Sequence, residues 1–297
     1  MMPRVTIGVP VYNGERYLDE CLTALSKQDY PDFELIISDN ASTDHTWQIC
    51  QQHAATDPRI RLHRNDTNLG GHTNYRLLTE LAHGELFKWA AYDDLCEPTY
   101  LSRCIDTLDT AGPPAILAYP QTLLINSDST IIGSYADRMN LRHPQAWRRV
   151  AGMAHGINLC HAHFGVVRLA ALRRTGMIRP YLSSDYTLLM ELAALGQIHE
   201  VPEPLFLRRI HTSSTRQGTD TSLTIATNWF GPQHQQTRGY RRHMVTATVH
   251  ALATRDQPLL TRAATTSAFL GTWYTRRTRV TLGRWRRSLT RGLDRRG

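Results

Sequence analysis

The chain has 297 residues, of which 41% are apolar, and it carries a formal net charge of +8 at pH 7. This length and composition allow one large domain or two smaller ones, each with a core of its own. No run of about 18 apolar residues exists, which excludes a membrane-spanning helix, and the start of the chain lacks a signal-peptide layout.

The first 119 residues alternate between short apolar runs and helical patterns. Five runs have the brevity and composition of buried strands: Val5–Val11, Phe33–Ser38, Ile60–His63, Leu86–Tyr92 and Ala115–Tyr119. Apolar residues at helical spacing separate them, at about 17–25, 43–55, 73–82 and 98–109. Such alternation predicts an α/β fold with a doubly wound, mostly parallel central sheet flanked by helices.

Beyond Tyr119 the pattern is less regular. We expect a hairpin at 122–126 and 130–133, a polar irregular stretch at 137–157 anchored by Trp147, and short strands at 198–201 and 205–207. A helix with leucines at helical spacing follows Ser184-Asp185. The remainder, from residue 222 onward, is expected to form a helical C-terminal extension with a basic tail.

Acidic residues stand where two of the predicted strands end. Asp39 follows the second strand, and the pair Asp93-Asp94 follows the fourth. Ligands of open α/β sheets bind at the carboxyl ends of the strands, so these acids can face one crevice. Adjacent carboxylates repel each other unless a cation shares them. An aspartate between a strand and a helix is also a common helix cap, and the spacing leaves both interpretations open.

Six motifs, in order, resemble the inverting glycosyltransferases of family 2, which have a GT-A type, Rossmann-like fold. The resemblance covers about residues 4–215. Its motifs are Val9-Pro10-Val11-Tyr12-Asn13-Gly14-Glu15, Asp39-Asn40-Ala41-Ser42-Thr43-Asp44, Asn68-Leu69-Gly70, Asp93-Asp94, Ser184-Asp185-Tyr186 and Arg209-Ile210-His211. It implies an enzyme that moves one sugar from a nucleotide diphosphate donor, with UDP favoured, to a hydroxyl acceptor with inversion.

The resemblance also implies an organisation of the chain. Residues 1–221 would form the GT-A domain, with a nucleotide-sugar half at 1–118 and an acceptor half at 119–221. Residues 222–297 would form the helical extension. Such an enzyme would be cytoplasmic, in keeping with five cysteines that lack metal-ligand spacing.

For the nucleotide, Tyr12 offers a flat ring and Asp39 an acceptor for the N3–H of a uridine-type base. Their alternatives are a loop-packing aromatic and an Asx turn. Glu15 either holds the ribose region or caps the first helix, and Asn68 is also readily structural. The predicted nucleotide-binding residues are Pro10, Val11, Tyr12, Glu15, Asp39, Asn68, Tyr92 and Asp93.

For the metal, the resemblance puts Asp93 on the last acid of the family's Asp-x-Asp motif. It would hold Mg²⁺ or Mn²⁺, which neutralises the leaving diphosphate. Ala91 stands where the first acid is usual, so that contact is lost or passes to Tyr92 or Asp94. Asp94 itself is expected to support the metal ligands without binding the ion directly, or to cap a helix. His211 is the second predicted ligand, with a surface histidine as its alternative.

Asp185 is the predicted general base. An inverting transfer needs one group that takes the proton from the acceptor hydroxyl as that oxygen attacks in line. The alternative is that Asp185 only caps its helix. Arg208 or Arg209 is expected beside the diphosphate as a fixed cation, and Glu191 is expected at the surface.

The positive charge belongs to the tail. From Leu270 to Gly297 there are nine arginines and one acid, a difference of +8, so the other 269 residues are formally neutral. This distribution argues against nucleic acid as a partner. Leu282, Trp285, Leu289 and Leu293 share one helical face, which predicts a helix on anionic lipid at the inner face of the membrane. A solvated, disordered tail is the alternative.

With such a tail, the acceptor would be a glycan or a glycolipid in cell-envelope polysaccharide or glycolipid biosynthesis. Two rival functions remain. A sugar nucleotidyltransferase would need a basic, glycine-rich loop after the first strand, where Tyr12–Glu15 is acidic. A non-catalytic, decayed sugar-nucleotide binder is favoured only by Ala91.

Overall fold

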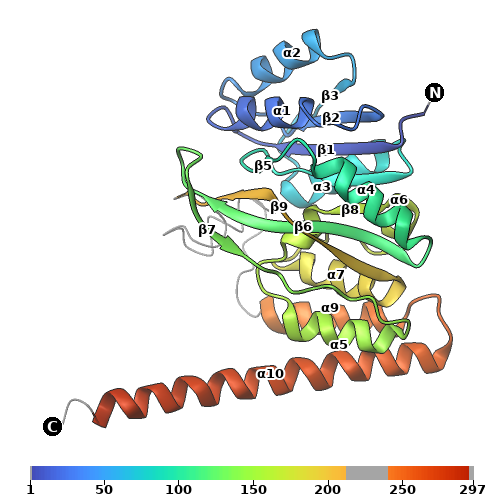
Figure 1. Cartoon of the computed structure of the whole chain (residues 1–297), viewed down its shortest axis with the longest axis vertical. Coiled ribbons are helices and arrows are strands. Elements are labelled where there is room, and N and C mark those ends of the chain that lie inside the picture. Colours follow the sequence, from blue (N-terminus) through green and yellow to red (C-terminus); the bar gives the residue numbers. More distant parts are fainter. Residues whose placement is uncertain (1, 212–239, 294–297) are drawn as a thin grey trace.

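A single twisted mixed sheet forms the centre of the computed structural model, which describes residues 2–211 and 240–293, with the side chains of 240 and 277–293 outside the description (Figure 1). The strand order is β3-β2-β1-β4-β8-β6-β9-β5, with β7 beside β6. The strands are β1 (Val5–Val11), β2 (Phe33–Asp39), β3 (Ile60–Arg64), β4 (Leu86–Trp89), β5 (Leu95–Cys96), β6 (Ala115–Ile125), β7 (Ile131–Tyr135), β8 (Val166–Arg168) and β9 (Gln197–Arg209).

The first four strands pair with one another in parallel, as predicted. β1 and β2 are buried along their whole length, which explains why both are continuous apolar runs. Their partner helices are α1 (Leu18–Ser26), α2 (Thr46–Thr56), α3 (Gly71–Leu81) and α4 (Tyr100–Ala111). The predicted α/β architecture with flanking helices is therefore confirmed.

The second half of the sheet is mixed. β8 is antiparallel to both β4 and β6, whereas β6 and β9 are parallel. The separate strands expected at 115–119 and 122–126 are one strand, β6, and those expected at 198–201 and 205–207 are one strand, β9. Register shifts near Pro120 absorb the prolines, so neither strand has to end there.

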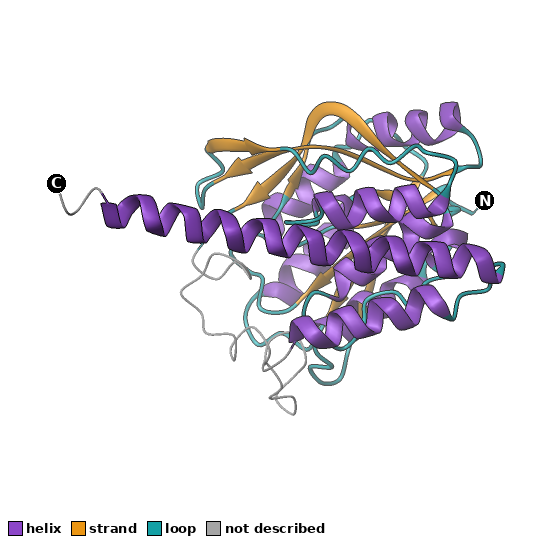
Figure 2. Cartoon of the chain, turned by 90° about the horizontal axis from the view of Figure 1, so that it is seen from below, coloured by secondary structure: helices purple, strands orange, loops and turns teal. Residues whose placement is uncertain are grey.

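The remaining helices form a layer below the sheet: α5 (Ala146–Gly156), α7 (Ser184–Leu195), α9 (Tyr240–Ala253) and α10 (Leu259–Leu293), with the short η1 (His161–Phe164) and α6 (Leu169–Leu172) nearer the strands. The stretch expected to be irregular therefore contains helix α5, and Trp147 is 40% exposed rather than a buried anchor. Figure 2 shows α10 lying across α5 and α9 and continuing beyond them. No helix in the described ranges is long and apolar enough to cross a bilayer.

Candidate functional site

The candidate site lies where β1, β2 and β4 end. Val11 and Asp39 are register partners in the last positions of β1 and β2, so Tyr12 leaves the sheet beside that carboxylate. Pro10 and Val11 are buried, and Tyr12 is half-buried. The chain after β4 turns out of the sheet before Asp93, although the Ala90 N–H still donates to the Gly8 carbonyl. The topology thus gathers the predicted residues of three motifs at one edge, as expected for an open α/β sheet.

Asp39 is fully buried, and its two oxygens differ. Oδ1 accepts the N–H of Ser42 at 3.1 Å, which is the Asx turn that sequence reasoning left as an alternative. Oδ2 lies 3.0 Å from Nε of Arg64 but has no aligned hydrogen-bond donor among the described residues. A buried carboxylate oxygen without a hydrogen bond is costly, so this atom fits a donor that a ligand would supply.

Hydrogen bonds join the loop after β1 to the loop after β2. The N–H of Asn13 donates to Oγ of Ser42, and the N–H of Gly14 donates to Oγ1 of Thr46. Glu15 accepts the N–H of His45 and contacts its ring, so it caps α2 rather than α1. That interaction also holds the pKa of Glu15 below its ordinary value. These contacts fix the loop that carries Tyr12.

Asn68 belongs to a network of amide side chains. Its Oδ1 accepts Nδ2 of Asn40 and the N–H of Gly70, and Asn40 in turn accepts Nδ2 of Asn65. Asn74 continues the network to Ser38 at the end of β2. These bonds support the structural alternative for Asn68, since the oxygen that a ligand would need is already shared.

Asp93 and His211 lie together: His211 Nε2 is 2.9 Å from Asp93 Oδ2. Burial acts to raise the pKa of Asp93, but the His211 bond and the charge of Arg208 outweigh it and bring that pKa below its ordinary value. Tyr17, which sequence reasoning took only as part of a helical pattern, packs its ring 5.1 Å from that of His211. The buried Tyr17 hydroxyl has no hydrogen-bond partner among the described residues.

Asp94 does not cap a helix. Its Oδ1 accepts the N–H of Arg209 at 2.9 Å, and its Oδ2 pairs with Arg208 at 3.0 Å. Burial raises the pKa of Asp94 to about 6, against the opposing charge of Arg208. Tyr92 packs its ring on Gly14 in the loop after β1. Of the two residues considered as replacements for the acid lost at Ala91, Asp94 has an ionic partner, whereas Tyr92 has none in the part of the chain that the structure describes.

Of the two arginines considered for a place beside the diphosphate, Arg209 is engaged in structural contacts. It is fully buried, and its guanidinium donates to the carbonyl of Asp93 and to the tip of the β6–β7 hairpin. It also pairs with Glu20 of α1 at 2.7 Å. Arg208 remains the cation at this edge, although Asp94 holds it.

Two side-chain donors fit a divalent cation that completes its coordination with phosphate oxygens and water. Mg²⁺ in particular is usually held by one or two protein carboxylates together with substrate phosphates. Asp93 and His211 are such a pair. In the ranges that the structure describes, no cluster of three or more His, Cys, Asp or Glu residues exists that could hold an ion without a substrate. The donor set therefore suits an ion that arrives with the nucleotide.

Asp185 is half-buried in the first turn of α7. Tyr186 fixes this turn, since its hydroxyl donates to the carbonyl of Asn158. His163 of η1 is near enough to Asp185 and Arg208 for both charges to affect its pKa, which Asp185 acts to raise and Arg208 to lower. Sequence reasoning missed His163 because a lone histidine in an irregular stretch belongs to none of the six motifs.

His163 is held in one tautomer. Its Nδ1 lies 2.7 Å from the carbonyl of Cys160, so Nδ1 carries the proton and Nε2 is left as an acceptor. Burial lowers the pKa of His163 to about 4. The ring therefore offers a neutral hydrogen-bond acceptor near Asp185.

We expect His163 to stay neutral below the ordinary histidine pKa of 6.5, down to about 4. The reason is that its charged form would lose hydration, and this cost outweighs the attraction of the Asp185 carboxylate, which acts to raise the pKa. Nitrogen chemical shifts from ¹⁵N-labelled histidine, with His163→Gln used for assignment, report the tautomer directly. The exposed His45 serves as the internal control, and a charged His163 at pH 6.5 would contradict this prediction.

Glu191 was expected at the surface and is instead buried in the middle of α7. It pairs with Arg179 at 2.7 Å and lies 3.5 Å from Arg255, just after α9. A buried carboxylate keeps its charge only with such partners. Glu191 therefore holds α7 in place rather than facing solvent.

Residues 6–173 match the sequence model of the family described as Glycosyl transferase family 2. An uncharacterized glycosyltransferase of Haemophilus influenzae is 24% identical over 218 residues, which cover 72% of this chain and 67% of that protein. Chondroitin synthase of Escherichia coli is 25% identical over 217 residues. The matched residues cover 72% of this chain but 30% of the synthase, so the match spans less than a third of that relative.

Solved structures resemble the whole chain. Staphylococcus aureus TarS 1–349 in complex with UDP-GlcNAc has a TM-score of 0.67 at 15% identity, covering 92% of this chain and 73% of that one. Mannosyltransferase PcManGT from Pyrobaculum calidifontis, in complex with GDP-Man and Mn²⁺, has a TM-score of 0.53 at 17% identity. The match covers 95% of this chain and 76% of that one. At these identities the likeness establishes the fold.

Proposed function

The chain belongs to glycosyl transferase family 2, and we propose that it moves a sugar from a nucleotide diphosphate, with UDP favoured, to a hydroxyl acceptor with inversion. One observation carries the proposal. The buried Asp39 carboxylate, with an oxygen that lacks a hydrogen bond, shares an edge of the sheet with the Asp93–His211 pair. A nucleotide diphosphate needs both kinds of partner, one for its base and one for its phosphates.

In the proposed complex, Oδ2 of Asp39 accepts the N3–H of the base. Arg64 covers that oxygen, and its side chain is partly exposed, so it is able to move aside when the base arrives. Tyr12 supplies the flat surface on which the base stacks. Backbone groups of Pro10 and Val11 complete this part of the site.

Asp93 and His211 would hold Mg²⁺ or Mn²⁺ together with the diphosphate. The bound ion would neutralise the charge that develops on the leaving phosphate. Because Ala91 replaces one acid of the usual motif, we expect the affinity for metal without nucleotide to be low. Arg208 adds a fixed positive charge near the same oxygens.

Asp185 would take the proton from the acceptor hydroxyl as its oxygen attacks the anomeric carbon. The N-terminal end of α7 favours a negative charge at this position. The neutral His163 ring, with Nε2 as an acceptor, is able to orient a second hydroxyl of the acceptor. One base without a nearby second carboxylate suits an inverting transfer.

The two rival functions differ from this proposal in testable ways. A decayed binder, favoured by Ala91, would bind a nucleotide sugar without turning it over. A nucleotidyltransferase would need cations in the loop after β1, and Glu15 occupies that loop. We further propose a cytoplasmic enzyme, peripheral at the membrane, that acts on a glycan or glycolipid of the cell envelope.

We expect titration calorimetry with UDP-GlcNAc, UDP-glucose and GDP-mannose to detect binding of a UDP-sugar that Mn²⁺ strengthens. Asp93→Asn should weaken the Mn²⁺-dependent part of the affinity by about tenfold or more, because the ion loses the one carboxylate proposed to hold it. Asp106→Asn, on the exposed side of α4, is the matched control. Equal affinity with and without Mn²⁺ would remove Asp93 and His211 from the metal role.

A further inference from the structure

Helix α10 exposes one face along its packed half. Leu260 is 83% and Tyr274 is 56% exposed, and Ser267 and Gly271 are exposed between them. Their spacings of seven, four and three residues put all four positions on one side of the helix. Phe269 and Thr265, on the opposite side, are fully buried against the protein. We call the first side the outer face of α10.

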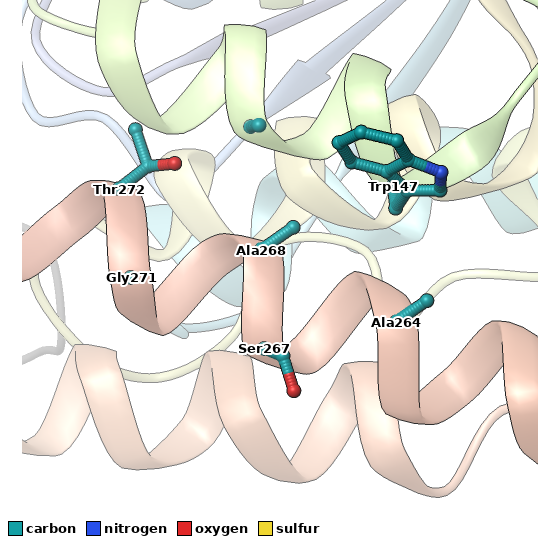
Figure 3. Close-up of a pocket in the computed structure, with 7 residues that line it drawn as sticks. Trp147, Ala264, Ser267, Ala268, Gly271 and Thr272 are labelled. Atoms are coloured by element: carbon teal, nitrogen blue, oxygen red, sulfur yellow. The ribbon is translucent and has the colours of Figure 1, made fainter.

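A groove runs beside this face, between α10 and α5. Its volume is about 450 Å³, and Figure 3 shows Trp147 of α5 at one end, above Ala264, Ala268 and Gly271 of α10. The lining is mostly apolar, and Trp147 is 40% exposed. Arg148 lies over that ring at 5.0 Å. Amphipathic aromatic rings with adjacent cations are favoured at the boundary between lipid tails and headgroups.

Neither helix contains an acidic residue. On α5, Arg148 is exposed, whereas Arg149 is buried and donates to backbone carbonyls, so it adds no charge to the surface. α10 carries eight arginines: Arg262, Arg276, Arg277, Arg279, Arg284, Arg286, Arg287 and Arg291. The side chains of the last six lie outside the described residues. A surface built from these two helices is therefore complementary to an anionic partner.

Arg276 is not available for that partner. Its Nη1 donates to the carbonyls of Ile157 and Ala154, which end α5, and this fixes α10 to the body. Beyond it the helix backbone continues to Leu293, past the body of the protein (Figures 1 and 2). Trp285 follows Ser267 by 18 residues, about five helical turns, and Leu289 follows Gly271 by the same number. Both positions therefore fall on the continued outer face.

The direction of this extension matters for the site. β1 begins near the N-terminus and runs toward the side on which α10 extends (Figure 1). The free end of α10 and the strand ends that carry the candidate site are therefore on the same side. A flat surface beneath α10 would pass below the acceptor side of the site.

We infer that the outer face of α10, together with Trp147 of α5, is a docking surface for an anionic lipid bilayer, on which α10 lies flat from Leu260 onward. This deepens the proposed peripheral membrane association, since it adds a structured part of the body to the basic tail. It also orients the site toward an acceptor held at the lipid surface.

The test is sedimentation of the full chain with vesicles of phosphatidylcholine and phosphatidylglycerol, and with pure phosphatidylcholine. Leu260→Glu/Tyr274→Glu should weaken binding to the anionic vesicles by about tenfold or more, since both side chains leave the apolar boundary and add like charge. The matched control is Ile131→Glu/Ile132→Glu on β7, where the side chains are 58% and 56% exposed. It should bind as the unaltered protein does.

Ser267→Glu supplies a second variant that removes no apolar side chain, and it should also weaken binding. Equal binding by the unaltered protein and both outer-face variants would overturn the inference. A dimer in solution that these variants dissolve would overturn it too, because the face would then belong to a second copy of the chain. The assay contains no donor sugar, so its failure is separate from a failure of the transfer reaction.

A truncation separates the tail from the face. The cut should follow Arg276, because removing residues from Leu270 would take away Trp273 and the Arg276 contact with α5. The shortened chain should retain part of its preference for anionic vesicles, and Leu260→Glu/Tyr274→Glu should remove the remainder. Complete loss on truncation alone would assign all binding to the tail and overturn the role of the face.

Discussion

Asp185→Asn should lower the rate of sugar transfer by about a thousandfold, the middle of the range for loss of a general base. The amide of asparagine cannot take the proton from the attacking hydroxyl. Asparagine remains a good residue at a helix start, so the first turn of α7 should keep its conformation. Release of UDP from the donor in the presence of an acceptor measures the rate.

The affinity for the donor should be unchanged in Asp185→Asn, because a general base acts on the acceptor hydroxyl and does not hold the nucleotide. Asp106→Asn is again the matched control, with an unaltered rate expected. A transfer rate within a few-fold of the unaltered enzyme would dismiss Asp185 as the base. His163 would then become the next group to replace, because its Nε2 is the other acceptor in that part of the site.

Arg209→Met should destabilise the fold by about 3–5 kcal/mol, the range for breaking a buried ionic network. The guanidinium donates to the carbonyls of Asp93, Asn126 and Ser127, and methionine leaves these acceptors without a partner. Glu20 is partly exposed and regains water, so the buried carbonyls account for most of the cost. The midpoint of thermal unfolding should fall by about 5–8 °C.

Arg103→Met is the control for loss of an arginine. That side chain is exposed on α4 and pairs with Glu203 at 3.3 Å, an interaction worth about 1 kcal/mol or less. If Arg209→Met and Arg103→Met unfolded at the same temperature, the network around Arg209 would contribute little to the stability of the fold. Because the Asp93 carbonyl is one of the acceptors, the variant should also weaken nucleotide-sugar binding.

The parallel half of the fold was accessible from sequence because its signals are local. Val5–Val11 and Phe33–Asp39 are continuous apolar runs, and the strand-end positions of Asp39 and Asp93 follow from them. The pairing of Asp93 with His211, 118 residues apart, was suggested only by the order of the motifs. No local pattern would have brought these two side chains together.

What sequence reasoning missed depends on long-range partners. Glu191 looks like an exposed charge in a leucine-rich helix, and its burial requires Arg179 and Arg255 from separate segments. Arg209 stands in a motif beside His211, yet its acceptors come from three other segments. Charged residues are rarely buried, so a prediction from single positions favours the surface for both.

Helix α7 is buried on nearly every side, and part of its enclosure comes from the end of the chain. Thr187 hydrogen-bonds Thr248 of α9 at 2.7 Å, and Tyr186 packs its ring 6.4 Å from that of Trp273 in α10. During synthesis these partners leave the ribosome after the nucleotide-binding strands have already emerged. A growing chain is therefore expected to form the strand ends of the candidate site before α9 and α10 can support the helix that carries Asp185.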